Sequence, residues 1–127
     1  MAELTTKDGL QFFFDPGALI AVADRDAETG EPSTTVYGLS ARPLRLTESV
    51  AAFLSRIAVA NSFASITRLD NSPIWIRCAA VQVIRPTLPG EYHPDANTFV
   101  SLGSLTMAVK EPLAQVRQTI NAHGGKL

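Results

Sequence analysis

The chain has 127 residues, of which 46% are hydrophobic, so it is long enough to bury one hydrophobic core without disulfides or metal ions. Eleven Lys and Arg residues against 12 Asp and Glu residues give a formal net charge of −1, which excludes a bulk electrostatic attraction to nucleic acid or anionic membrane. The single cysteine, Cys78, excludes an intramolecular disulfide and a multi-cysteine zinc site.

The N-terminal residues lack a basic segment followed by an apolar run, and nowhere do 18 apolar residues follow one another. We therefore expect a soluble, cytoplasmic protein that has no membrane partner. The sequence also contains no pattern that calls for a cofactor.

The two halves of the chain align with each other. Identical residues recur at an offset of 62 or, after one extra residue in the middle loop, 63: Asp8/Asp70, Ala18/Ala80, Thr35/Thr98, Glu48/Glu111 and Ile57/Ile120. Apolar positions follow the same offsets. This pattern predicts an internal duplication, with repeat one at about residues 4–59 and repeat two at about residues 66–122.

Each repeat is predicted to begin with a β-hairpin. In repeat one, residues 4–7 and 10–14 flank Asp8-Gly9, a two-residue turn signal whose central residues favour positive φ. Asp70-Asn71 takes the same place in repeat two, and Asn tolerates the left-handed conformation well. Pro73 lacks a backbone N–H, so the strand that it begins is expected near a sheet edge.

Three further strands are predicted in each repeat. They are an apolar strand at 18–23 and 79–84, a strand after a polar loop at 35–39 and 98–102, and a short return strand at 44–46 and 107–109. On the second of these, Tyr37 and Leu39 are expected to share one face, as are Val100 and Leu102.

A helix is predicted to close each repeat. Thr47 is expected to cap the first helix, followed by Glu48 at the positive end of the helix dipole. One buried stripe is expected along this helix: Val50, Phe53, Leu54 and Ile57.

The second helix is expected to start at Glu111-Pro112 and to end before Gly124-Gly125. Its buried stripe keeps Leu113, Val116 and Ile120. Arg117 stands where the first helix has Leu54, which narrows the stripe.

Residues 60–64 are the one plausible linker, and this linker is too short to separate two domains. A unit of about 55 residues would bury little surface alone. The predicted fold is therefore α+β, with two tandem ββββα-like repeats packed with pseudo-twofold symmetry into a single globular domain over residues 1–127.

The second half resembles the FlbD family of small flagellar and swarming-motility proteins. The resemblance is carried by Thr67-Arg68-Leu69-Asp70-Asn71, by Pro94-Asp95 with Thr98, and by Val109-Lys110-Glu111-Pro112. Repeat one keeps Asp8-Gly9 and Thr47-Glu48-Ser49-Val50 of the same pattern. FlbD proteins are single units, so the tandem arrangement is a departure. The resemblance implies a small non-enzymatic regulatory or accessory protein and identifies no binding residues.

Phe13 and Trp75 are the main candidate site residues. Strand alternation assigns Phe12 and Phe14 to the core face and Phe13 to the other face, and Ile74, Ile76 and Trp75 repeat that division. The two aromatics are either platforms for a partner or residues covered by the other repeat, by a loop or by a second protomer. Tyr92 and Arg77 complete the candidate partner surface.

The order of elements is also similar to the strand-strand-strand-strand-helix units of PC4-like and PUR proteins, which present sheets to single-stranded nucleic acid. In that reading Phe13 and Trp75 stack on bases. The supporting cations are Arg42, Arg45, Arg68, Arg77 and Arg85.

Catalytic and metal-binding patterns are absent from the sequence. His93 lies beside Glu91 and Asp95, but a metal site or a catalytic dyad needs further groups at fixed geometry, so a surface turn is expected there. Cys78 is expected to be a small buried residue. We therefore predict a non-enzymatic protein-interaction or regulatory module whose partner is an unidentified protein or a second copy of the chain. The alternatives are a single-stranded nucleic-acid-binding protein and an enzyme with a site between the repeats.

Overall fold

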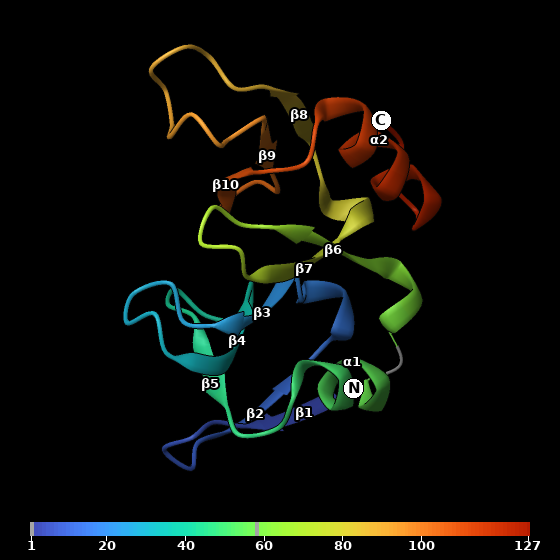
Figure 1. Cartoon of the computed structure of the whole chain (residues 1–127). Helices are drawn as coiled ribbons and strands as arrows, with labels where there is room; N and C mark the ends of the chain where they lie inside the picture. The colour runs from blue at the N-terminus through green and yellow to red at the C-terminus, as the bar shows by residue number, and fades with distance from the viewer. Residues whose placement is uncertain (1, 58) are drawn as a thin grey trace.

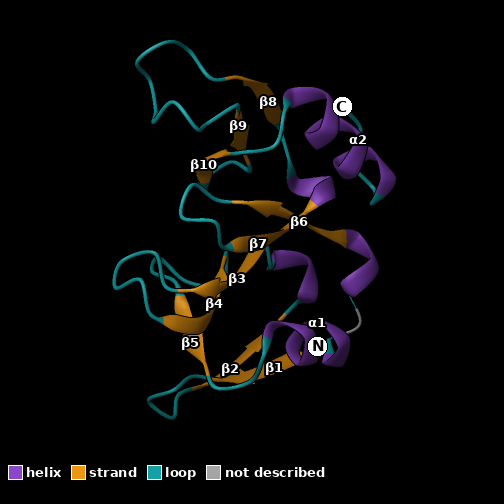
Figure 2. Ribbon diagram, in the orientation of Figure 1, coloured by secondary structure: helices purple, strands orange, loops and turns teal. Residues whose placement is uncertain are grey.

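The computed structural model describes residues 2–57 and 59–127 and has an α+β fold (Figures 1 and 2). The first half, residues 2–57, contains β1 (Ala2–Thr5), β2 (Gln11–Phe14), the 3₁₀-helix η1 (Pro16–Ala18), β3 (Ala21–Arg25), β4 (Pro32–Tyr37), β5 (Leu44–Leu46) and α1 (Val50–Arg56). The second half, residues 59–127, contains the 3₁₀-helix η2 (Ala60–Ser62), β6 (Phe63–Thr67), β7 (Pro73–Arg77), the 3₁₀-helix η3 (Cys78–Ala80), β8 (Val83–Pro86), β9 (Thr98–Ser101), β10 (Thr106–Val109) and α2 (Leu113–Ala122).

The same order of elements therefore occurs twice: two strands, a 3₁₀-helix, three strands and an α-helix. The 3₁₀-helices correct the prediction of strands at 18–23 and 79–84. In the first half, Pro16 cannot donate to a ladder, and the Asp15 carboxylate accepts a hydrogen bond from the backbone N–H of Gly17 at 2.9 Å, which caps the short helix. The strands that follow begin three residues later than expected in the first half and four later in the second.

The strands form three antiparallel sheets. β1 and β2 make a two-stranded sheet, and β10, β9 and β8 make a three-stranded sheet. The largest sheet has the order β5-β4-β3-β7-β6, so three strands of the first half continue into the first hairpin of the second half. Figure 1 shows the β1–β2 pair at one end of the molecule and β8 to β10 at the opposite end.

This strand order does not confirm the predicted pseudo-twofold arrangement. A twofold relation would place β2 beside β8 in the same chain, because β7 and β3 are their counterparts. Within the described residues, β3 pairs with β7, whereas β2 and β8 belong to different sheets. The halves are thus joined through one strand pair.

Two hydrophobic clusters lie on opposite faces of the five-stranded sheet. One is built mainly from the first half and includes Leu4, Phe14, Val22 and Phe53; the other is built mainly from the second half and includes Ile74, Ile76, Val116 and Ile120. The sheet therefore belongs to both cores. Residues 60–64 are not a linker, because Phe63 and Ala64 begin β6 and are buried.

Tyr37 and Leu39 do not share a face, since Tyr37 packs against the cluster of the second half and Leu39 against that of the first. The chain leaves β4 after Tyr37, at Gly38, whose φ of +105° ends the alternation of an extended strand. Both predicted return strands are present, as β5 and β10.

The helix stripes are confirmed for α1, where Val50, Phe53, Leu54 and Ile57 are all buried. The predicted cap is wrong by two residues: Ser49, not Thr47, caps α1 and accepts a hydrogen bond from the N–H of Ala52 at 3.2 Å. In α2, Val116 and Ile120 are buried and Leu113 is half-buried. None of the helices in the described residues is long and apolar enough to span a membrane.

The hairpin turns also differ in detail from the predicted two-residue type. Thr6 N–H donates to Leu10 O at 2.8 Å and Gly9 N–H donates to Thr6 O at 3.0 Å, which makes a three-residue loop with Gly9 alone at positive φ. Arg68, Asn71 and Ser72 repeat these two bonds in the second half, with Asn71 at φ 69°. The turn positions themselves were predicted correctly.

Candidate interaction surface

The junction between the halves is an antiparallel pairing of β3 with β7. Val22 lies opposite Trp75, with Ala21 opposite Ile76 and Ala23 opposite Ile74. The N–H of Arg77 donates to Ile20 O at 2.9 Å, and hydrogen-bonded pairs alternate along an antiparallel ladder. Val22 and Trp75 therefore form the next hydrogen-bonded pair of the junction.

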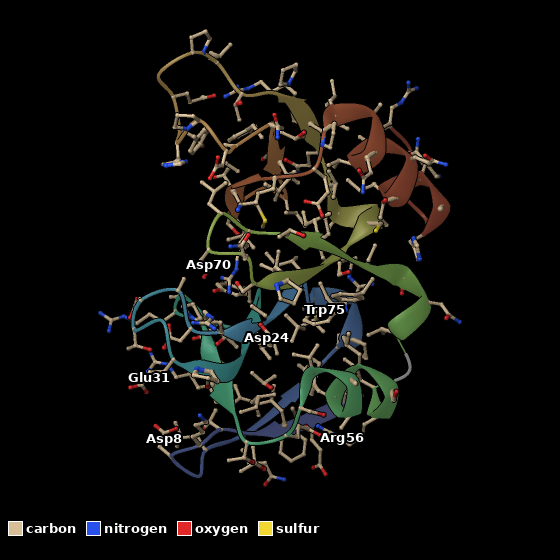
Figure 3. All side chains as sticks on the ribbon, viewed as in Figure 1. Asp8, Asp24, Glu31, Arg56, Asp70 and Trp75 are labelled. Carbon is tan, nitrogen blue, oxygen red and sulfur yellow. The ribbon has the colours of Figure 1, made fainter. Side chains whose placement is uncertain are left out.

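The Trp75 side chain packs against the core cluster of the first half, and it is half-buried. It lines an open hollow of about 420 Å³ together with Ala51, Leu54 and Ser55 of α1 and with Ser65 and Thr119 of the second half. Figure 3 shows Trp75 in the middle of the molecule, between the two halves. Of the two readings left open for this aromatic, the structure supports the one in which the other half covers it.

Arg77 also links the two halves at this junction. Its Nε donates to Leu19 O at 2.7 Å, its Nη2 donates to Pro16 O, and its guanidinium lies 5.1 Å from the ring centroid of Phe63. Burial lowers the pKa of the Arg77 guanidinium, while the nearby Asp15 carboxylate acts in the opposite direction. Arg77 thus connects β7 of the second half with η1 of the first half. Its N–H donors are directed at backbone carbonyls of the chain rather than at an outside partner.

Phe13 occupies the position in β2 that Trp75 occupies in β7, but its surroundings are different. The Phe13 side chain is 66% exposed, and β2 pairs with β1 alone among the described strands. The bond from Thr6 N to Leu10 O fixes the alternation of the β1–β2 ladder, so the backbone N–H and C=O of Phe13 point away from β1. We call this side of β2, with Phe13 at its centre, the β2 edge.

A hollow of about 460 Å³ lies beside Phe13. It is lined by Ala2, Glu3, Phe13, Pro16, Arg56 and Ile57. Four of these positions, those of Ala2, Glu3, Phe13 and Arg56, match Ala64, Ser65, Trp75 and Thr119 of the hollow at the junction. The hollow at Phe13 is therefore lined by counterparts of residues that the second half contributes to the hollow at the junction.

A second free strand side lies at β8, the counterpart of β3. Val83 is 46% exposed, and β8 pairs with β9 alone among the described strands. Thr87 N–H donates to Asn97 O at 3.3 Å at the end of this ladder, so alternation directs the backbone groups of Ile84 away from β9. We call this side of β8, with Val83 and Ile84 at its centre, the β8 edge.

Tyr92 lies in the loop between β8 and β9, away from Phe13, Trp75 and Arg77. It is 37% exposed and its ring centroid lies 6.5 Å from that of Phe99. The same loop is anchored by Arg85, whose guanidinium contacts the Glu91 carboxylate at 2.6 and 2.8 Å and lies 4.2 Å from the Phe99 ring centroid. The four predicted site residues therefore do not form one surface.

Most of the predicted cations for nucleic acid are engaged within the chain. Arg45 pairs with Asp26, and Arg85 pairs with Glu91. Arg68 donates to Ser72 and to Arg25 O, and Arg77 donates to Pro16 O of η1 and to Leu19 O. His93 is exposed, and its Nδ1 accepts a hydrogen bond from the backbone N–H of Asp95 at 3.2 Å. Within the described part of the chain, no three His, Cys, Asp or Glu side chains are grouped as a metal site requires.

Sequence reasoning missed Val83 and Ile84. The signal was present in the alignment of the halves, where Ala21 and Val22 of the buried β3 correspond to the larger apolar pair Val83 and Ile84. What was missing was the knowledge that β3 pairs across the halves.

Comparison with protein-family models, with curated proteins and with solved structures finds no match for this chain.

Proposed function

We propose that the protein is a non-catalytic protein-interaction module that binds its partner by strand addition at its free sheet edges. The observation that carries this proposal is the exposure of Phe13 on a strand side whose backbone groups have no partner strand among the described residues. An unpaired edge offers a row of N–H and C=O groups, and an aromatic side chain beside them adds apolar contact area.

The distribution of exposed apolar residues supports this function. Large exposed hydrophobic side chains in the described residues are Leu10, Phe13, Val83, Leu88 and Tyr92. Phe13 and Val83 lie on the two edges, and Leu10 immediately precedes β2. Apolar side chains gathered at unpaired strands are typical of binding surfaces.

We further propose that the chain arose from two fused copies of one ββηβββα unit, since the order of elements, the turn bonds and the 3₁₀-helices all recur. The resemblance to the single-unit FlbD proteins agrees with this origin and with an accessory or regulatory role. The duplication gives each element of the junction a counterpart elsewhere in the chain.

The function can be tested with a photo-crosslinking residue, p-benzoylphenylalanine, in place of Phe13. In a lysate of the source cells, crosslinking to protein at this position supports an interaction module. Leu88, which is 59% exposed in a loop, provides the matched control position. Adducts at residue 13 that nuclease removes would instead favour a nucleic-acid-binding protein, and equal labelling at both positions would refute a specific surface at Phe13.

A further inference from the structure

We propose that the β2 edge of one copy of this chain pairs with the β8 edge of a second copy, so that the chain assembles head to tail. This inference rests on the proposed function and names the partner. The chain carries its own template for the contact, because β7 already pairs with β3 in the junction between the halves, and β2 and β8 are the counterparts of these strands.

The template fixes the register of the proposed pairing. Val22 opposite Trp75 corresponds to Ile84 opposite Phe13, and the flanking pairs correspond to Val83 opposite Phe14 and Arg85 opposite Phe12. Backbone geometry supports this register independently. The ladders of the two separate sheets direct the N–H and C=O of Phe13 and of Ile84 toward the free edges, which is what a hydrogen-bonded pair requires.

Pro86 agrees with the position of β8 at an edge. An inner strand donates backbone N–H groups to neighbours on both of its sides, and proline has no N–H to donate. The alternation of the β8–β9 ladder directs the nitrogen of Pro86 toward the free side of β8. The pairing of β3 with β7 involves only Ala21, Val22 and Ala23 of β3. Their counterparts in β8 are residues 83–85. Pro86 therefore lies just beyond the proposed pairing.

The positions that line the junction hollow have counterparts around the two free edges. At the existing junction, Trp75 shares its hollow with Ala51, Leu54 and Ser55 of α1. The counterparts on α2 are Ala114, Arg117 and Gln118, all of which are exposed. Among the described residues, the hollow beside Phe13 is lined by Arg56 of α1 in its own half but by no helix of the second half, so α2 of a second copy would complete it.

The charges are complementary as well. Leu54 of the first half and Ser65 of the second half both line the junction hollow, and their counterparts are Arg117 and Glu3. Glu3 lines the hollow beside Phe13 in the first half, and both side chains are exposed in the single chain. Glu3 accepts a hydrogen bond from Gln11 at 3.0 Å, and Arg117 donates one to Leu127 O at 3.1 Å, so each charged group at the surface already has a hydrogen-bond partner within its own chain. In the assembly, a carboxylate on one copy would therefore face a guanidinium on the next, at the helix position where α1 carries the buried Leu54 and α2 the exposed Arg117.

Pairing of two different edges is a heterologous contact, so each added copy leaves one β2 edge and one β8 edge free. Such a contact continues until the chain of copies closes into a ring or grows into a filament. In either case the new sheet has the order β1-β2-β8-β9-β10, which matches the five-stranded sheet β6-β7-β3-β4-β5 within the chain.

The proposal is tested by sedimentation velocity on the purified full chain over a series of concentrations. Phe13→Pro removes the edge-facing N–H of β2, and Ile84→Pro does the same for β8. We expect the wild-type chain to exceed the mass of a monomer, and each variant alone to remain monomeric. An equimolar mixture of the two variants should form a dimer and stop there, because the mixture retains one working β2 edge and one working β8 edge. Leu88→Ser is the control and should assemble like the wild type.

Circular dichroism and thermal unfolding establish that the variants fold, and Phe13→Lys and Val83→Lys replace either proline variant that does not. A second readout is charge reversal: Glu3→Lys or Arg117→Glu alone should weaken self-association by about threefold or more, and the double variant should recover it. A wild-type chain that stays monomeric at all concentrations would overturn the proposal. So would a mixture that stays monomeric, or an Ile84→Pro variant that dimerises alone through two β2 edges. If residue 13 still crosslinks to another protein while the pure chain is monomeric, the interaction module stands and self-assembly fails.

Discussion

Trp75 lies directly opposite Val22 on a strand pair that joins the two halves of the chain, and its side chain packs on the core of the half that it does not belong to. Phe13, at the matching position of β2, has no such cover and is 66% exposed. At equivalent positions of the two halves, one aromatic side chain therefore packs against the other half and the other is exposed to solvent.

We expect Trp75→Ala to destabilise the chain by about 2–3 kcal/mol, at or just below the lower limit for truncating a fully buried large aromatic, because Trp75 is half-buried. Phe13→Ala is the matched control, and in dilute solution it should change the free energy of unfolding by less than about 0.5 kcal/mol. Chemical denaturation monitored by circular dichroism measures both. Equal losses for the two variants would contradict the assignment of Trp75 to the junction.

Glu111 connects the start of α2 with β6 through side-chain hydrogen bonds. Its carboxylate oxygens accept hydrogen bonds from the N–H of Thr67 at 2.9 and 3.0 Å and from Thr67 Oγ1 at 2.9 Å. Glu111→Gln replaces one acceptor oxygen by a donor, so we expect a loss of about 1–2 kcal/mol in the free energy of unfolding.

The matching residue of the first half, Glu48, serves as the control for Glu111. It pairs with Arg56 at 2.7 Å, and both side chains are partly exposed. Glu48→Gln should therefore cost less than about 0.5 kcal/mol. If Glu48→Gln cost as much as Glu111→Gln in the same denaturation experiment, the contact of Glu111 with Thr67 would not be the cause.

Local pattern predicted much of each half, because period and turn chemistry act over a few residues. Alternation assigned Phe14 to the core and Phe13 to the other face, and helical spacing identified the buried residues Phe53 of α1 and Ile57 at its C-cap. By the same alternation Trp75 and Phe13 are equivalent. Their different environments depend on β7 pairing with β3, a contact between residues more than 50 positions apart that no local pattern encodes.

Register within the sheets was the other limit of prediction. The alignment of identical residues matched Thr35 with Thr98. In the sheets, however, Thr98 lies opposite Val109, and the first-half residue opposite the counterpart of Val109, Leu46, is Thr34. The structural counterpart of Thr98 is therefore Thr34. Thr34, Thr35 and Thr98 are all buried, so only the strand partners distinguish the two matches. An offset of one residue exchanges the two faces of a strand, so the alignment of identical residues puts Thr35 in the place that Thr34 takes in the sheet. The face of β9 was nevertheless predicted correctly, because Val100 and Leu102 are both buried in the same cluster.

The loop between β8 and β9 should respond to acid through Glu91. Hydrogen bonds from Arg85, and then from the backbone N–H of Leu88, lower the pKa of Glu91 from 4.5 to about 2. A lowered pKa in the folded state stabilises the loop at pH values above 4.5, and this contribution is lost as the pH falls through about 2.

We expect NMR titration to show the Glu91 carboxylate and the Leu88 N–H changing together near the lower pH. In Glu91→Gln the Leu88 signal should no longer titrate, while Glu31→Gln, at another exposed loop glutamate, should leave it unchanged. Titration of Glu91 near 4.5 would show that the contact with Arg85 does not form in solution.

Cys78 should be chemically inert while the chain is folded. It lies in η3, its side chain is 0% exposed, and burial raises the pKa of the thiol to about 11. Because the thiolate is the reactive form, both the missing access and the raised pKa oppose modification. We expect Ellman's reagent at pH 8 to leave the native chain unlabelled and to label one thiol per chain in urea, with Cys78→Ser as the blank. Rapid labelling of the native chain would show that η3 opens without global unfolding, and it would contradict the placement of Cys78 in the core of the second half.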